Sequence, residues 1–123
     1  MTMRHLDSAP DATYSSAVVA AGLVHTAGQI GEDPATGVVP GEFEAEVHLA
    51  LDNLERVLAE AGSHLGRLIM VTAYLADLGL ADTFNRVYRE RVPHPRPARA
   101  TVQVGMFSPY RVELACVAVL DGP

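Results

Sequence analysis

The stretch VELACVAV, residues 112–119, decides which kind of fold this chain can adopt. Successive side chains of a strand point to opposite faces of a sheet, and here both sets are apolar except for Glu113. The preceding segment 99–107 also reads as a strand, and Ser108-Pro109-Tyr110 joins the two. We therefore predict two final strands, 99–107 and 111–120, that pair as a hairpin.

Two helices are predicted upstream of these strands. The apolar residues of 42–61 recur with a helical period, and Gly62 ends the pattern. A second helical pattern runs over 80–91 and stops before Pro93. Between them, residues 68–76 are apolar at both odd and even positions, which fits a strand covered on both faces.

The N-terminal part is predicted to hold short strands and turns. Residues 16–20 and 23–27 read as two strands about a tight turn, and Val38-Val39 is a candidate for one more. Gly28 and Gly31 are interpreted as turn residues that need an unusual φ.

This order of elements favours a single two-layer α+β domain over residues 1–123, with two helices on one face of a sheet and residues 1–11 as a loose arm. Two helices cover only one face, whereas the last strand is apolar on both. An uncovered apolar face is typical of an association surface. We therefore predict a homo-oligomer that buries it.

Composition excludes several classes of function. The chain has 123 residues, a formal net charge of −6 and 6% aromatic residues, which disfavours nucleic-acid binding. All nine basic residues are Arg, so a lysine Schiff base is impossible. The lone Cys116, the absence of a long apolar run and an N-terminus unlike a signal peptide predict a cytoplasmic protein. The five His show no metal-ligand spacing.

In the predicted hairpin, the polar residues that interrupt the apolar pattern of the two strands lie on the face away from the helices. Arg99, Thr101, Gln103 and Glu113 would share that face, with residue 105 opposite Glu113. Arg99 then lies six residues from the position opposite Glu113, which is about 20 Å. If the two groups act together, they must come from different subunits.

Several motifs carry a resemblance to a known family. Residues 97–104 (PARATVQV) and 112–118 (VELACVA) resemble the C-terminal signature of the RidA family, also called YjgF/YER057c/UK114. The resemblance extends over nearly the whole chain. Its further matches are Tyr14-Ser15-Ser16-Ala17-Val18, Ala27-Gly28-Gln29-Ile30-Gly31, Asn53-Leu54 and Phe84-Asn85-x-Val87-Tyr88.

The resemblance implies a chorismate-mutase-like α+β fold with a mixed sheet, assembled as a homotrimer with active sites between subunits. It also implies an enamine/imine deaminase that hydrolyses small 2-imino acids, such as iminopropanoate and iminobutanoate, to 2-keto acids and ammonia. No metal or organic cofactor is implied. The partners are a small imino- or keto-acid ligand and further copies of the chain, with no nucleic acid and no membrane.

Residue roles follow from the same resemblance. Arg99 matches the residue that binds the substrate carboxylate, which suits a planar guanidinium fork. Glu113 matches the acid that activates water and carries a proton to nitrogen. The other implied substrate contacts are Tyr14 closing over the ligand, the N–H of Gly31, a hydrogen bond from Asn85, and the backbone polar groups of Thr101.

The sequence also departs from the family pattern. Ala27 stands where the family has Ser, and Thr101 replaces a frequent Cys. These changes leave three alternatives open: a module that binds small carboxylates without turnover, a member of a specialised biosynthetic pathway, and an RNA-cleaving protein. The net charge of −6 and the absence of Lys argue against RNA cleavage.

Overall fold

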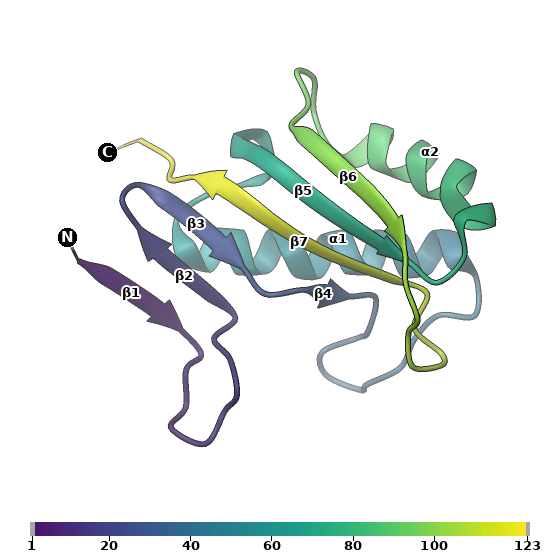
Figure 1. The fold of residues 1–123 in the computed structure, drawn as a ribbon, viewed down its shortest axis with the longest axis horizontal. Helices are drawn as coiled ribbons and strands as arrows, with labels where there is room; N and C mark the ends of the chain where they lie inside the picture. The colour runs from purple at the N-terminus through teal and green to yellow at the C-terminus, as the bar shows by residue number, and fades with distance from the viewer. Residues whose placement is uncertain (1, 123) are drawn as a thin grey trace.

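A mixed sheet with two helices behind it forms the body of the protein (Figure 1). The structure, a computed structural model, describes residues 2–122. The elements include two short 3-10 helices, η1 (Leu65–Arg67) and η2 (Leu78–Leu80). In chain order the elements are β1 (Met3–Leu6), β2 (Ala17–Ala20), β3 (Leu23–Thr26), β4 (Gln29–Ile30), α1 (Phe43–Ala61), η1 (Leu65–Arg67), β5 (Leu68–Leu75), η2 (Leu78–Leu80), α2 (Ala81–Arg91), β6 (Ala98–Gln103) and β7 (Val112–Val119).

The strands lie in the order β1-β2-β3-β7-β5-β6, and the short β4 pairs with β7. Among the strand pairs of residues 2–122, only β5 and β6 run parallel, and the other pairs are antiparallel. The expectation of a mixed sheet is thus confirmed. Parallel neighbours need a crossover connection, and α2 supplies it between β5 and β6 (Figure 1).

The predicted hairpin between the last two strands is wrong. β5 lies between β6 and β7, and each of these strands pairs with one edge of β5. Residues 104–111 connect β6, at the edge of the sheet, to β7, which lies on the other side of β5. The opposition of residues 105 and 113 therefore does not exist. Glu113 is opposite Tyr74 of β5 and Ile30 of β4.

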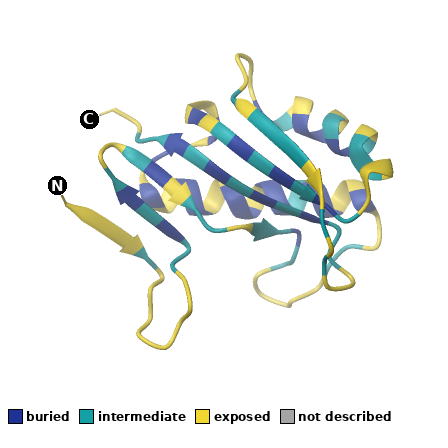
Figure 2. Ribbon diagram, viewed as in Figure 1, coloured by how far each residue is buried: buried dark blue, intermediate teal, exposed yellow. Residues whose placement is uncertain are grey.

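Both helices cover the same face of the sheet, as predicted. The apolar stripe of α1 contacts β7, β4, β3 and β2, and α2 packs beside α1. On β7 the buried and half-buried residues alternate (Figure 2): Val112, Leu114, Cys116 and Ala118 face the helices, whereas Glu113, Ala115, Val117 and Val119 are half-buried on the open face. No described helix covers that open face.

The helix ends agree with the sequence analysis. Gly62 takes a left-handed conformation with φ 94°, and its N–H donates to the carbonyl oxygens of Leu58 and Ala59. This closes α1 in the way glycine favours. The second helix ends at Arg91, before Pro93, because proline has no N–H for the helical ladder.

The N-terminus differs from the expected loose arm. Residues 3–6 form β1, which pairs antiparallel with β2 at the edge of the sheet. Arg4 also donates a 2.8 Å hydrogen bond from Nη2 to the carbonyl oxygen of Ala61. Val38-Val39 is not a strand, whereas Gln29-Ile30 forms the short β4.

Candidate functional site

Arg99 lies in a cavity of about 370 Å³ between β6 and α2. Its Nη2 donates a 2.6 Å hydrogen bond to Oδ1 of Asn85. The guanidinium carbon lies 4.6 Å from the ring centroid of Tyr88 and 5.2 Å from that of Phe84. Cations over aromatic faces are attracted by the ring quadrupole. Arg99 is therefore held in one place, and its other donors have no partner among residues 2–122.

Tyr88 supports Arg99 from the helix. Its side chain is 5% exposed, and its hydroxyl is the only buried side-chain polar atom of residues 2–122 without a hydrogen-bond partner. Burial raises the pKa of Tyr88, and the nearby charge of Arg99 opposes that rise. At neutral pH the ring is a neutral phenol beneath the guanidinium.

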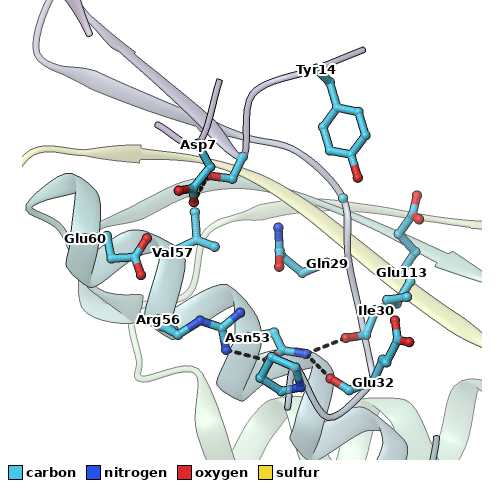
Figure 3. Close-up of a pocket in the computed structure, with 13 residues that line it drawn as sticks. Asp7, Tyr14, Gln29, Ile30, Glu32, Asn53, Arg56, Val57, Glu60 and Glu113 are labelled. Atoms are coloured by element: carbon cyan, nitrogen blue, oxygen red, sulfur yellow. Dashed lines mark hydrogen bonds between the residues drawn. The ribbon is translucent and has the colours of Figure 1, made fainter. Parts of the chain in front are cut away.

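Glu113 lies where two other cavities meet. One cavity, of about 380 Å³, includes Tyr14, Gly28 and Gln29 in its lining, and Figure 3 shows Tyr14 and Glu113 on the same side of it. The second, of about 390 Å³, is lined largely by apolar and aromatic residues from Tyr74 and the 104–110 segment. The Glu113 carboxylate makes no hydrogen bond or ion pair within residues 2–122. It is an unpaired acid that faces open space.

Arg99 and Glu113 point to opposite faces of the sheet, which corrects the expectation that they share one. Arg99 is in register with Val71, a buried residue on the helix face, whereas Glu113 is in register with Tyr74 on the open face. The two positions differ by three residues along the strands and two strand spacings, or about 14 Å. Thr101 and Gln103 follow Arg99 on the helix face, and Gln103 accepts a hydrogen bond from the Leu78 N–H.

The remaining predicted contacts divide between these two regions. Asn85 lies with Arg99, and Thr101 is half-buried further along β6. Tyr14, on the loop before β2, is 71% exposed and lines the cavity of Glu113. Gly31 is buried at the end of β4, beside the strand that pairs with Glu113. The predicted site residues of one chain thus lie in two separate regions.

Gly28 and Gly31 both lie in close contacts and neither has a positive φ. The described glycines with positive φ are Gly22, Gly37 and Gly62. A Cβ on Gly28 would lie 2.6 Å from Cδ of Glu113, and a Cβ on Gly31 would lie 2.2 Å from the Glu46 carbonyl oxygen. The interpretation that these two glycines need an unusual φ is therefore wrong.

Asn53 shapes the wall of the Glu113 cavity. It is 5% exposed, and its Nδ2 donates 2.8 Å hydrogen bonds to the carbonyl oxygens of Ile30 and Glu32 (Figure 3). Its Oδ1 accepts a 2.7 Å bond from Nη1 of Arg56. The Nδ2 and the Oδ1 of this buried amide are therefore both engaged in hydrogen bonds. The Nδ2 bonds fix the segment around Gly31 on α1.

Sequence reasoning missed a second buried polar group, Glu46. It is fully buried, and its carboxylate binds Arg111 through the backbone N–H and through Nε, both at 2.7 Å. The signal was present: Glu46 and Asn53 interrupt the apolar stripe of α1 on its core-facing side. Buried charged residues without a partner are rare, so their positions on that stripe predict partners elsewhere in the chain.

The thiol of Cys116, another reactive group, lies in the protein core. Cys116 is buried, and desolvation raises the pKa of its thiol to about 11. Within residues 2–122, no three His, Cys, Asp or Glu side chains are grouped so as to hold a metal ion. None of the helices in that range is both long and apolar enough to cross a bilayer.

A family model described as endoribonuclease L-PSP matches residues 6–120. The chain belongs to this family, also known as YjgF/RidA. Curated relatives include the bovine protein named 2-iminobutanoate/2-iminopropanoate deaminase, which is 38% identical over 89% of this chain and 81% of its own length.

Solved structures agree with the family assignment. A crystal structure titled as a putative endoribonuclease L-PSP from Entamoeba histolytica matches with a TM-score of 0.87 and 34% identity, over 97% of this chain and 100% of its own. E. coli TdcF with bound serine matches with a TM-score of 0.82 and 29% identity, over 89% and 90% of the two chains. The α+β fold with two helices is therefore that of the YjgF/RidA family.

Proposed function

We propose that the protein is an imine/enamine deaminase that hydrolyses small 2-imino acids to 2-keto acids and ammonia. The observation that carries this proposal is the pair of partial sites in one chain: a fixed guanidinium with free donors, and an unpaired carboxylate beside two cavities. The name of the bovine relative supports the reaction class. The bound serine of the E. coli structure supports a small amino-acid-like ligand.

Arg99 binds the substrate carboxylate. Asn85 and the ring of Tyr88 fix its guanidinium before the ligand arrives. A preorganised fork loses little side-chain freedom on binding and accepts two carboxylate oxygens side by side. Asn85 is left able to donate from its Nδ2 to the same ligand.

Glu113 acts as general base and then as general acid. It takes a proton from water as the water oxygen bonds to carbon 2 of the imine. It gives that proton to the imine nitrogen, which forms a carbinolamine. It then takes the proton of the carbinolamine hydroxyl and gives it to the same nitrogen as the carbon–nitrogen bond breaks, so both water protons leave with ammonia and the 2-keto acid remains. Such proton transfer contributes about 10² to 10⁴ in rate. Tyr14 closes the cavity above the substrate.

The two partial sites combine only between copies of the chain. Arg99 and Glu113 lie on opposite faces of one sheet at about 14 Å, too far for one small substrate. The open face of β7 and β5 carries half-buried apolar residues that an assembly would cover. We therefore propose a homotrimer in which one subunit supplies Arg99 and its neighbour supplies Glu113.

The direct test generates iminopropanoate from alanine with an amino-acid oxidase and follows its decay. The wild-type protein is expected to accelerate the decay. Arg99→Lys keeps the charge but removes the fork, so KM rises, while Glu113→Gln lowers kcat about 10² to 10⁴-fold. Unchanged decay with wild-type protein, or full activity in Glu113→Gln, contradicts the proposal.

A matched measurement separates turnover from mere binding. Calorimetry with 2-ketobutyrate reports ligand binding whether or not an imine is hydrolysed. Heat of binding that disappears in Arg99→Ala, together with inert wild-type protein in the decay assay, would favour a small-carboxylate-binding module instead. The observation that favours this second function is Ala27, which precedes the cavity-lining Gly28 and stands where the family pattern has Ser.

A further inference from the structure

Glu46 is a buried carboxylate that the proposed chemistry does not use. It lies in the first turn of α1 with no exposed surface. Its Oε2 accepts the backbone N–H of Arg111, and its Oε1 accepts Nε of the same residue, both at 2.7 Å. Burying an ion pair costs desolvation that only good geometry and further hydrogen bonds offset. Such a pair calls for an explanation beyond simple stability.

Arg111 extends the connection to two further segments. Its Nη2 donates to the carbonyl oxygens of Pro40 and Gly41, both at 3.1 Å. Its guanidinium carbon lies 5.4 Å from the ring centroid of Phe43. Its own carbonyl oxygen accepts the Ala76 N–H at 3.0 Å. The backbone is therefore fixed on both sides of Arg111, two residues before Glu113.

Glu46 also supports the other strand beside Glu113. Gly31 packs so closely on Glu46 that a Cβ there would lie 2.2 Å from the Glu46 carbonyl oxygen and 2.6 Å from its Cγ. Gly31 directly follows Ile30, the residue of β4 in register with Glu113. One buried side chain and its backbone thus hold the start of β7 and the end of β4 together.

We propose that Glu46 is a positioning residue that, through Arg111 and Gly31, sets the place of the Glu113 carboxylate between its two cavities. This inference rests on the proposed function. Misplacing a reacting group by about 1 Å can cost about 100-fold in rate. Arg99 lies in a different cavity on the other face, so loss of Glu46 leaves carboxylate binding intact.

The central experiment compares Glu46→Gln with Glu44→Gln. Glutamine keeps the shape of Glu46 but turns an NH₂ group towards a donor of Arg111. Glu44 lies on the same helix in an exposed pair with Arg86 at 2.8 Å, which makes it the matched control. For Glu46→Gln we expect kcat to fall about 10- to 100-fold with KM within about twofold. Glu44→Gln should match wild type.

Equal kcat in the two variants overturns the inference, and so does a rise in KM that accounts for the whole loss. Because Glu46→Gln also weakens the fold, a double variant, Glu46→Met with Arg111→Met, replaces the buried pair by apolar side chains of similar length. Such replacements often keep stability. If thermal stability and kcat recover together, Glu46 is merely structural; if stability recovers and kcat stays low, it positions Glu113.

Hydrogen exchange keeps this test independent of turnover. If wild-type protein hydrolyses no imine, the proposed function fails while the positioning remains measurable. Amide exchange at residues 112–114 should be faster in Glu46→Gln than in Glu44→Gln. Identical exchange in the two variants overturns the positioning role regardless of activity.

Discussion

At the scale of single residues, each of the two proposed site residues lies against neighbours that take no part in the proposed chemistry. Arg99 rests on the rings of Tyr88 and Phe84, and Glu113 lies over Gly28, where a Cβ would displace it. The sequence motifs predict Arg99 and Glu113 as a pair, and that pairing stays a prediction. The aromatic support and the close approach at Gly28 depend on tertiary contacts, which no local pattern records.

The buried Cys116 thiol predicts a pH dependence of stability. Burial raises its pKa from an ordinary value near 9 to about 11, so the folded thiol stays protonated where the unfolded one ionises. Its stabilising contribution is complete below pH 9 and is lost as the pH rises through 11. The loss is at most about 1.4 kcal/mol per pH unit.

Urea denaturation at pH 8, 9 and 10 checks this dependence. The free energy of unfolding of wild-type protein should fall more steeply with pH than that of Cys116→Ala, which retains every other titrating group. Parallel curves for the two proteins would show that the thiol ionises equally in the folded and unfolded chains.

At the scale of elements, the helices were predictable and the strand pairing was not. The 42–61 stripe and the Pro93 stop are local signals, and α1 and α2 follow them within a residue or two. The short connection at 108–110 is also a local signal, and it favours a hairpin. The actual partner of β6 is β5, because the α2 crossover returns the chain parallel to β5. The order of strands in a sheet depends on contacts between segments that are distant in the sequence, so a local pattern does not predict it.

Gly31 tests the contact between β4 and α1. Gly31→Ala places a Cβ against the Glu46 backbone, which cannot yield as a flexible side chain would. Overpacking of this kind costs about 1 to 3 kcal/mol. Gly41→Ala is the control, because a Cβ there meets nothing within 4 Å and Gly41 has no positive φ.

Chemical denaturation of both alanine variants measures the difference. We expect a lower midpoint for Gly31→Ala and an unchanged midpoint for Gly41→Ala. If the two variants have the same denaturation midpoint, the close contact between Gly31 and the Glu46 backbone does not exist.

At the scale of the whole molecule, the apolar open face connects the fold to the proposed function. The alternation of residues 112–119 predicted an uncovered face and an oligomer, and the sheet does leave that face free of helices. The shared site is predicted from the sequence through a hairpin that the structure does not contain. The structure replaces that reasoning with a different fact, namely that Arg99 and Glu113 face opposite sides of one sheet.

Mixing two variants that are each expected to be inactive tests whether Arg99 of one subunit and Glu113 of its neighbour share a site. Arg99→Ala and Glu113→Gln are unfolded together, refolded, and assayed for iminopropanoate hydrolysis, with native mass spectrometry to verify mixed assemblies of about three times the 13.1 kDa chain mass. In a cyclic assembly with random mixing, about one quarter of the sites combine an intact Arg99 with an intact neighbouring Glu113. We expect the mixture to recover about that share of wild-type activity. Mixed assemblies that stay inactive would contradict this expectation.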